Sequence, residues 1–316
     1  MSITQIFLLA IIQGITEFLP VSSSGHLNLL HGLTDLPDQG IIIDVAVHGG
    51  TLLAVIIYFR HDVMRLIRGG LEILGLKILR PRNFSDTSEH KSAALQIIIA
   101  TLPILPFGAL LVLTGWIDLL RDPKVVAWAT IIFSLPLFLA DHFRPSNTSV
   151  QATGWRGAAI IGCAQIFALI PGASRAGVTI TAARALGCNR QDAARFSMLL
   201  SIPVIIIFAS LGLMDLLAAG DMVLLGNAAL AAVLAAITAL ASIHLFMKMT
   251  AKLSLLPFLF PTPFTPVMSL SFDFAYSHYP CRPSPSAMKL YLVLTLSITF
   301  VSNAFYAPHR LVSPRF

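Results

Sequence analysis

Two short runs of the sequence place polar and ionisable side chains inside otherwise apolar stretches. The first run, residues 13–26 (QGITEFLPVSSSGH), contains a carboxylate, three serine hydroxyls and an imidazole. The second run, residues 171–179 (PGASRAGVT), contains a single arginine among small and hydroxyl-bearing residues. Ionisable groups are costly inside a bilayer, and where they occur there they mark functional sites. An acid, a base, hydroxyls and a guanidinium predict one phosphate-handling site if the two runs meet.

In the first run, Gln13 and Glu17 are four residues apart and therefore share one face of a helix. The Glu17 carboxylate can bind a metal ion, act as a general base, or hold a neighbouring helix through hydrogen bonds. His26 follows Ser23 by three residues, and an imidazole beside a hydroxyl can activate a nucleophile or transfer a proton. Ser22 is also consistent with a capping role at the start of the next helix.

In the second run, Arg175 is the only charged residue and stands at the start of a returning half-helix. Free N–H groups at a helix N-terminus favour an anion, and a guanidinium matches the geometry of phosphate oxygens. Gly172 permits close backbone approach, while Ser174 and Thr179 offer hydroxyls. We therefore expect these three residues, with Ser22, to bind the substrate and Arg175 to act in catalysis.

Other polar residues receive smaller roles. Asp44 and His48 are four apart within an apolar segment, so they can line the same cavity and support the site. Arg184 and Arg190 are interpreted as orientation signals on the cytoplasmic side. The sequence contains neither GxxxxGK[ST] nor CxxC, which argues against a nucleotide loop and a zinc site. Three scattered cysteines do not make a disulfide framework.

The composition is that of an integral membrane protein. Hydrophobic residues make up 56% of the 316 residues and charged residues only 11%, against about 25% charged in soluble domains. The length suits roughly six to eight spans. The net charge of +6 does not indicate nucleic acid as a partner, because the basic residues cluster in loops as orientation signals do. The apolar N-terminus lacks a basic flank and a cleavage site, so no removable signal peptide is predicted.

The order of the apolar segments positions the two polar runs. These segments are 3–19, 27–33, 41–59, 92–116 (kinked at Pro103 and Pro106), 125–140, 157–170, 177–186, 196–219 and 222–247. The first pair and the sixth and seventh segments are too short to cross twice and are interrupted by proline, so each pair predicts a re-entrant hairpin. Residues 60–91 are rich in arginine and lysine and are predicted to be a cytoplasmic loop. The two hairpins then enter the membrane from opposite faces.

The chain also shows a weak internal repeat. Pro20-x-x-Ser23 and Pro171-x-x-Ser174 share their spacing, and each half reads as a broken hairpin followed by spans. Inverted repeats with discontinuous helices place their sites at the repeat interface. The predicted fold class is an all-α polytopic membrane protein, an inverted-repeat bundle with two opposed re-entrant helix–loop–helix hairpins. Its predicted parts are a membrane domain (1–258, with halves of about 1–140 and 141–258) and a proline-rich tail (259–316, with one apolar segment at 287–306).

The two runs resemble the signature motifs of the undecaprenyl-diphosphate phosphatase family, also called the bacitracin-resistance family. The Gln13–Glu17 spacing resembles its [E/Q]-x-x-x-E pattern, and DVAVHGGT (44–51) and FSMLLSIP (196–203) resemble other family segments. The resemblance covers roughly residues 1–258. The chain departs from it at Ala176, where the family usually has serine, at Arg195, where it often has glutamate, and after Phe258, where proline-rich sequence replaces a final apolar span.

The resemblance implies a hydrolase of the bacterial inner membrane that removes the terminal phosphate of a C55 polyprenyl diphosphate, a phosphoric anhydride. This reaction recycles the lipid carrier for peptidoglycan synthesis. The resemblance also implies a site that opens to the periplasm and dependence on a divalent cation, Mg²⁺ or Ca²⁺. On this hypothesis Glu17 and Gln13 bind the cation, His26 transfers protons, and either Ser23 or water is the nucleophile. Membrane lipids are further expected partners, and the hypothesis allows for a homodimer.

A secondary transporter or flippase of a polyprenyl phosphate is the alternative hypothesis, because inverted repeats and broken helices are also transporter features. The closeness of Ser23 and His26 to Glu17 in the sequence favours the enzyme, since transport needs paired charges but no nucleophile.

Overall fold

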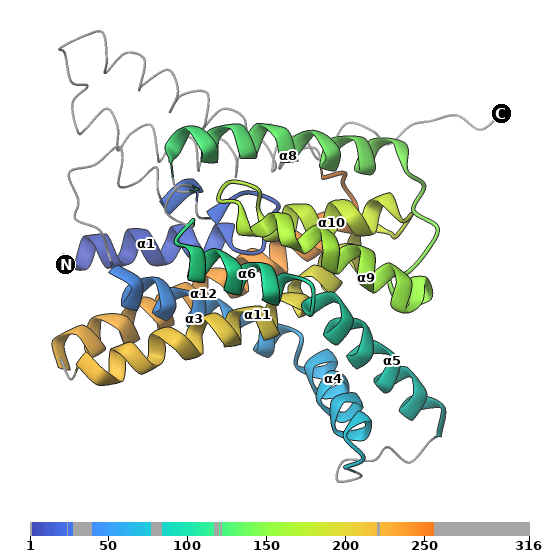
Figure 1. Cartoon of the computed structure of the whole chain (residues 1–316), viewed down its shortest axis with the longest axis horizontal. Coiled ribbons are helices and arrows are strands. Elements are labelled where there is room, and N and C mark those ends of the chain that lie inside the picture. Colours follow the sequence, from blue (N-terminus) through green and yellow to red (C-terminus); the bar gives the residue numbers. More distant parts are fainter. Residues whose placement is uncertain are drawn as a thin grey trace, which may run out of the picture.

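The computed structural model describes residues 2–23, 25–27, 40–76, 84–116, 120, 122–219 and 222–255, and in these ranges the chain forms helices and no β-strand (Figure 1). The α-helices are α1 (Ile3–Thr16), α3 (Gly40–Tyr58), α4 (Arg60–Ile73), α5 (Phe84–Thr101), α6 (Ile104–Thr114), α8 (Pro123–Phe143), α9 (Gly154–Gln165), α10 (Arg175–Ala185), α11 (Arg190–Ala219) and α12 (Met222–Thr250). Two short 3₁₀ helices, η1 (Gln151–Thr153) and η2 (Ile166–Leu169), flank α9.

Four helical stretches of the described chain are long and apolar enough to cross a membrane: Ser88–Thr114, Lys124–Phe143, Arg190–Ser210 and Met222–Thr250. Helix α3 qualifies together with α4, from which it is separated by a bend of 91°. Large apolar side chains such as Leu113 and Ile132 are exposed on the outer surfaces of these helices, as expected for contact with lipid. The protein is therefore an all-α, multi-pass membrane protein, as predicted.

The prediction of a loop at 60–91 was wrong. Residues Arg60–Ile73 form α4, and α5 begins at Phe84. The many basic residues indicated a loop, but Val63 and Leu66 recur at helical spacing and pack against the main core. Residues 77–83 lie outside the described residues.

Both predicted chain breaks are present. Helix α1 ends at Thr16, and residues 17–20 form a turn before a short helical stretch that includes His26. In the second half, α9 passes into η2, the chain breaks at residues 170–174, and α10 returns. The predicted kink at Pro103 separates α5 from α6, whereas Pro106 lies within the first turn of α6. Most of the predicted segment 27–33 and the whole predicted tail, 259–316, lie outside the described residues.

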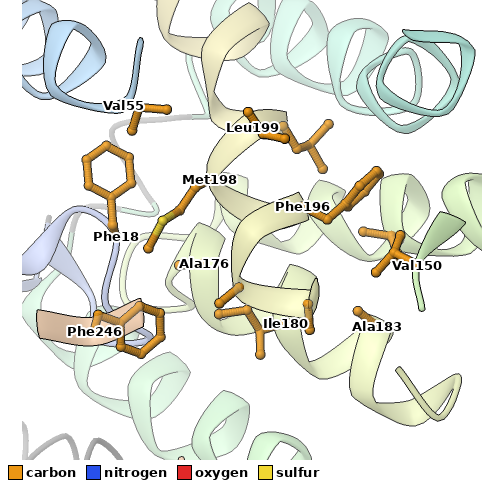
Figure 2. Packing of buried hydrophobic residues seen from close by; sticks show 14 of the residues in the cluster. Phe18, Val55, Val150, Ala176, Ile180, Ala183, Phe196, Met198, Leu199 and Phe246 are labelled. Carbon is orange, nitrogen blue, oxygen red and sulfur yellow. The ribbon is translucent and has the colours of Figure 1, made fainter. Parts of the chain in front are cut away.

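Helix packing fixes the position of the first break. Helices α1, α3 and α12 lie side by side (Figure 1) and share a core that contains Ile6, Leu9 and Ile43. Close approach is required here, because a Cβ atom on Gly50 would lie 2.1 Å from the carbonyl oxygen of Ala232. Beyond α1, Phe18 is buried in the main core, the larger cluster, beside Val55 and Met198 (Figure 2). This anchor sets the residue before it, Glu17, between α3 and the start of α10.

Candidate active site

The two polar runs meet at their tips. The hydroxyl of Ser174 donates a hydrogen bond of 3.1 Å to the carbonyl oxygen of Val21, and so joins the second break to the first. Ser174 also caps α10, since its oxygen accepts from the backbone N–H of Gly177 at 3.2 Å. Its φ of 56° is in the left-handed region, a strained conformation for a residue with a Cβ atom. Strain of this kind persists only where the surrounding contacts impose it, and it clusters at functional sites.

At the junction of the tips, Glu17 pairs with Arg175. The Nη2 atom of Arg175 donates to Oε1 of Glu17 at 3.2 Å, and Nη1 donates to the carbonyl oxygen of Ser197 at 3.1 Å. The side chains of Glu17 and Arg175 are only 7% and 12% exposed. Burying both charges costs desolvation free energy, which the interactions of the pair must offset. This pair therefore differs from an exposed ion pair on the surface. The predicted convergence of the two runs is thus observed.

The second carboxylate oxygen of Glu17 is surrounded by three polar groups. Oε2 accepts from Nε2 of Gln13 at 2.8 Å and from the Ser23 hydroxyl at 3.2 Å. Nε2 of His48 lies 3.7 Å from the same oxygen. The His48 ring is held from its other side, because Nδ1 is 2.7 Å from the carbonyl oxygen of Asp44. Glu17 is therefore the centre of the site, with contacts from three helices and one tip.

The site does not place His26 against Ser23. The described structure has no hydrogen bond between them; Nδ1 of His26 lies 2.6 Å from the carbonyl oxygen of Ser22. Because a carbonyl only accepts, Nδ1 carries the hydrogen and Nε2 remains available for proton transfer. The hydroxyl oxygen of Ser22 accepts from the N–H of Gly25 at 3.1 Å, which is the capping role considered above. The imidazole that contacts the carboxylate is that of His48.

Thr179 supports the site from behind. Its hydroxyl bonds the carbonyl oxygen of Arg175 at 2.8 Å and the hydroxyl of Ser197 at 2.7 Å, and the residue is buried. These contacts fix the first turn of α10 against α11. The substrate-binding role predicted for Thr179 stays a prediction; the contacts of its hydroxyl also make it a residue that positions Arg175.

Gly172 occupies a position that no other residue fits well. Its φ is +99°, and a Cβ atom there would lie 2.3 Å from the carbonyl oxygen of Val126. We expect Gly172→Ala to lower the free energy of unfolding by about 2 kcal/mol or more and to reduce activity by displacing Arg175. Thermal unfolding in detergent measures the first effect. Gly226→Ala is the matched control, since nothing lies within 4 Å of its Cβ position; equal stability of the two variants would contradict the assignment.

The residues present suit a hard divalent cation. Oε1 of Gln13 is buried and has no hydrogen-bond partner, and the Glu17 carboxylate lies one helical turn away. Carboxylate and amide oxygens are ligands that Mg²⁺ and Ca²⁺ prefer. Among the described residues no group of three or more His, Cys, Asp or Glu side chains is arranged to hold a metal, so most ligands would have to come from a phosphate substrate and water.

Sequence reasoning gave His48 only a supporting role and missed Ser197 entirely. His48 carried a usable signal, since a histidine one turn after Asp44 in an apolar segment is costly unless it faces the site. Ser197 contributes its backbone carbonyl to Arg175, and no residue pattern reports a carbonyl. Its hydroxyl, within FSMLLSIP, was the available clue.

The interpretation of Arg184 as an orientation signal was wrong. Arg184 is fully buried and donates to the Asp141 carboxylate at 3.2 Å, to Ser146 at 2.9 Å and to the backbone carbonyls of Asp141, Arg144 and Cys188. Arg190 donates to the same Asp141 oxygen at 2.6 Å, and the N–H of Leu255 to the other at 2.9 Å. This Asp141 cluster ties the ends of α8 and α10, the start of α11 and the residues after α12 together.

Fold and site together define a class: a multi-pass helical membrane protein with a buried acid–arginine site formed by two broken helices. Comparison with known proteins agrees. The family model for bacitracin resistance protein BacA matches residues 6–262, and the chain belongs to this family.

Relatives of this chain from different bacteria share one name, undecaprenyl-diphosphatase. The undecaprenyl-diphosphatase of Ruegeria sp. (strain TM1040) is 45% identical over 260 residues, which cover 82% of this chain and 94% of that protein. The undecaprenyl-diphosphatases of Maricaulis maris (strain MCS10) and Nitrosococcus oceani (strain ATCC 19707) are each 42% identical, over 261 and 258 residues, with the same shares covered. The family resemblance inferred from the two motifs is confirmed.

Proposed function

We propose that this chain hydrolyses undecaprenyl diphosphate to undecaprenyl phosphate and inorganic phosphate. The relatives' names supply the substrate. The observation that carries the proposal to this chain is the 3.2 Å contact between Glu17 and Arg175, which unites the two motifs in one buried site. Phosphoryl transfer depends on positioning and on neutralising charge, and this site offers both. The reaction would recycle the lipid carrier for peptidoglycan synthesis, in keeping with the family's link to bacitracin resistance.

In the proposed complex, Arg175 holds the terminal phosphate. Its guanidinium is fixed at Nη1 by the Ser197 carbonyl, so its remaining N–H groups keep a defined direction. The phosphate also accepts hydrogen bonds from the free backbone N–H groups at the start of α10, where the helix dipole favours an anion. Ser174 and Gly172 shape this end of the site, Ser174 by capping the helix and Gly172 by keeping the backbone close to α8.

The chemical step uses Oε2 of Glu17, the carboxylate oxygen that contacts the Ser23 hydroxyl. An oxygen nucleophile, either the Ser23 hydroxyl or a water molecule, attacks the terminal phosphorus, and the bond from that phosphorus to the bridging oxygen breaks. Glu17 Oε2 already accepts the Ser23 hydroxyl and takes the proton of the nucleophile. His26 transfers protons through Nε2, because its Nδ1 is occupied by Ser22. If Ser23 is the nucleophile, water then hydrolyses the phosphoserine and regenerates the hydroxyl.

We assign Glu17 and Gln13 as the protein ligands of a divalent cation, Mg²⁺ or Ca²⁺. The unpartnered buried oxygen of Gln13 supports this assignment. A bound cation would neutralise negative charge on the phosphoryl oxygens. We also propose that the protein lies in the bacterial inner membrane with α4 on the cytoplasmic side, as its basic residues favour by the positive-inside rule. The family resemblance implies that the site opens to the periplasm.

Phosphate release in detergent micelles tests the proposal. The full-length chain, purified in micelles, is mixed with undecaprenyl diphosphate with and without a chelator. We expect phosphate release that the chelator stops and added Mg²⁺ or Ca²⁺ restores. A transporter would release none, because micelles enclose no second compartment. Folded protein that releases no phosphate at any cation concentration would overturn the proposed function, and release that is indifferent to chelation would overturn the cation assignment alone.

His48 is expected to position Glu17 rather than to react. Replacing it with alanine removes the group 3.7 Å from Oε2 and should lower kcat about 10- to 100-fold, the usual effect of losing a partner that orients a ligand. His48→Gln keeps a hydrogen-bonding side chain of similar reach and should recover much of kcat. Steady-state kinetics of both variants checks this, with KM expected to change less than kcat. Equal loss in the two variants would argue against a positioning role.

A further inference from the structure

Helix α4 leaves the bundle at a right angle. It follows α3 after Phe59, and the two axes differ by 91°. If α3 crosses the membrane, α4 lies close to the membrane plane. Figure 1 shows α4 and α5 projecting together away from α1, α3 and α12.

One face of α4 packs against the rest of the protein. Val63 and Leu66 pack against the main core. Gly69 is buried against α5 so closely that a Cβ atom would lie 2.0 Å from the carbonyl oxygen of His90. The exposed side chains of α4 therefore face away from the bundle.

That outward surface is divided into two stripes. Met64, Ile67 and Leu74 are 42%, 47% and 74% exposed, and at 3.6 residues per turn they fall within a sector of about 80°. His61, Arg65 and Arg68 follow in the next sector; of these, His61 and Arg65 are exposed. The exposed Arg60, four residues before Met64, lies in the apolar sector at the first residue of the helix. An exposed apolar stripe beside a basic stripe is the pattern of a helix that lies in a membrane interface.

The outward charge of α4 is mainly positive. The helix contains two acids, Asp62 and Glu72. Asp62 is bound by Arg195, whose Nε donates at 2.9 Å, and the Glu72 side chain is only 8% exposed. Asp62 also lies 4.0 Å from Nη1 of Arg65, so Arg65 and Arg195 share this one carboxylate. In the described chain no ion pair holds Arg60, and the exposed charge of α4 is therefore net positive and complementary to an anionic surface.

We propose that α4 is an interfacial helix that binds the anionic headgroups of the adjacent phospholipid leaflet. Met64, Ile67 and Leu74 enter the acyl-chain boundary, and Arg60, Arg65 and Arg68 contact lipid phosphates, their aliphatic stems lying over the apolar stripe. This inference concerns a surface outside the active site and does not depend on the proposed hydrolysis.

Lipid selection by the full-length protein tests the charge. The protein is placed in nanodiscs of mixed phosphatidylglycerol and phosphatidylcholine, and the lipids that it retains are counted by native mass spectrometry. Arg60→Gln/Arg65→Gln should reduce retained phosphatidylglycerol about fivefold or more, since each arginine near an anionic leaflet adds about that factor. The matched control, Lys248→Gln/Lys252→Gln, removes two exposed charges from the end of α12. If both variants lose the same amount of phosphatidylglycerol, the retention depends on the total charge of the protein and not on α4, and the proposal is overturned.

Depth measurements test the orientation. Spin labels at cysteines replacing Met64 or Ile67 should be accessible to oxygen, which concentrates in the acyl region, and labels replacing His61 or Arg65 to a water-soluble nickel reagent. The variants are made with Cys163 and Cys281 changed to serine. Labels at positions 64 and 67 that report water, or contact with another protein, would overturn the proposal.

Discussion

Replacing Arg175 with alanine is expected to abolish phosphate release, with a loss of about a thousandfold or more. An arginine that stabilises charge in phosphoryl transfer contributes on this scale, and Arg175 reaches Glu17 and Ser197 at once. The substitution also leaves the 7% exposed Glu17 side chain without its cation, so thermal unfolding must be measured beside activity. Gln13 and Ser23 still donate to that carboxylate and should preserve the fold.

Two further variants separate chemistry from folding. Arg175→Lys keeps the charge but cannot reach the Ser197 carbonyl and Glu17 from two fixed donors, so we expect a large loss of kcat in a protein that unfolds near the normal temperature. Arg195→Ala removes an arginine from the same half of the chain; its side chain is 43% exposed and pairs with Asp62 outside the site. Its activity should change by less than about threefold, as for exposed pairs. Near-normal phosphate release by folded Arg175→Ala would rule out the assigned role.

Replacing Arg184 with alanine is expected to cause the largest loss of stability. Arg184 is fully buried and bonds Asp141, Ser146 and three backbone carbonyls. Breaking a buried ion pair costs about 3–5 kcal/mol, and the lower end applies because Asp141 retains Arg190 at 2.6 Å. The midpoint of thermal unfolding should fall by about 6 °C or more, whereas Arg195→Ala should shift it little.

Cys188 provides a local readout of the same variant. Burial raises the pKa of the Cys188 thiol to about 11, so at mildly alkaline pH the thiol is protonated and reacts slowly with alkylating reagents. Arg184 itself holds this pKa down, so the loss of its charge alone would slow alkylation. We expect loosening of the loop to dominate, because burial is the main cause of the raised pKa, and alkylation to become faster in a chain whose other cysteines are serine. Unchanged unfolding and unchanged alkylation together would show that the Asp141 cluster does not stabilise the protein.

The predictable part of this structure follows from the cost of polar groups among apolar ones. Glu17 and Arg175 stand out because each is a charged residue in an apolar stretch that offers it no opposite charge, so their convergence was predictable from the sequence. The chain breaks at Pro20 and Pro171 were predictable for a related reason, since proline removes a helical hydrogen bond. The two motifs also sufficed to assign the family.

Other parts of the site depend on how the helices are rotated and packed against each other, which sequence patterns do not report. The rotation of α3 about its axis, set by packing on α12, decides that His48 rather than His26 contacts Glu17. The partner of Arg175 on α11 is a backbone carbonyl, which every residue carries. Arg184 was misjudged because an arginine at a helix end resembles an orientation signal until Asp141, 43 residues earlier, is found beside it. The α4 helix was missed because its charges suggested a loop.

The Glu17–Arg175 pair has a consequence for biosynthesis. The partners are 158 residues apart, and at 5–20 residues per second the ribosome needs roughly 8–30 s to make the second after the first. For that time the nascent chain carries an acid without its cation. Gln13 and Ser23 come from the same N-terminal stretch and already donate to the carboxylate, so they are the groups that can shelter it until the rest of the polypeptide has been synthesised.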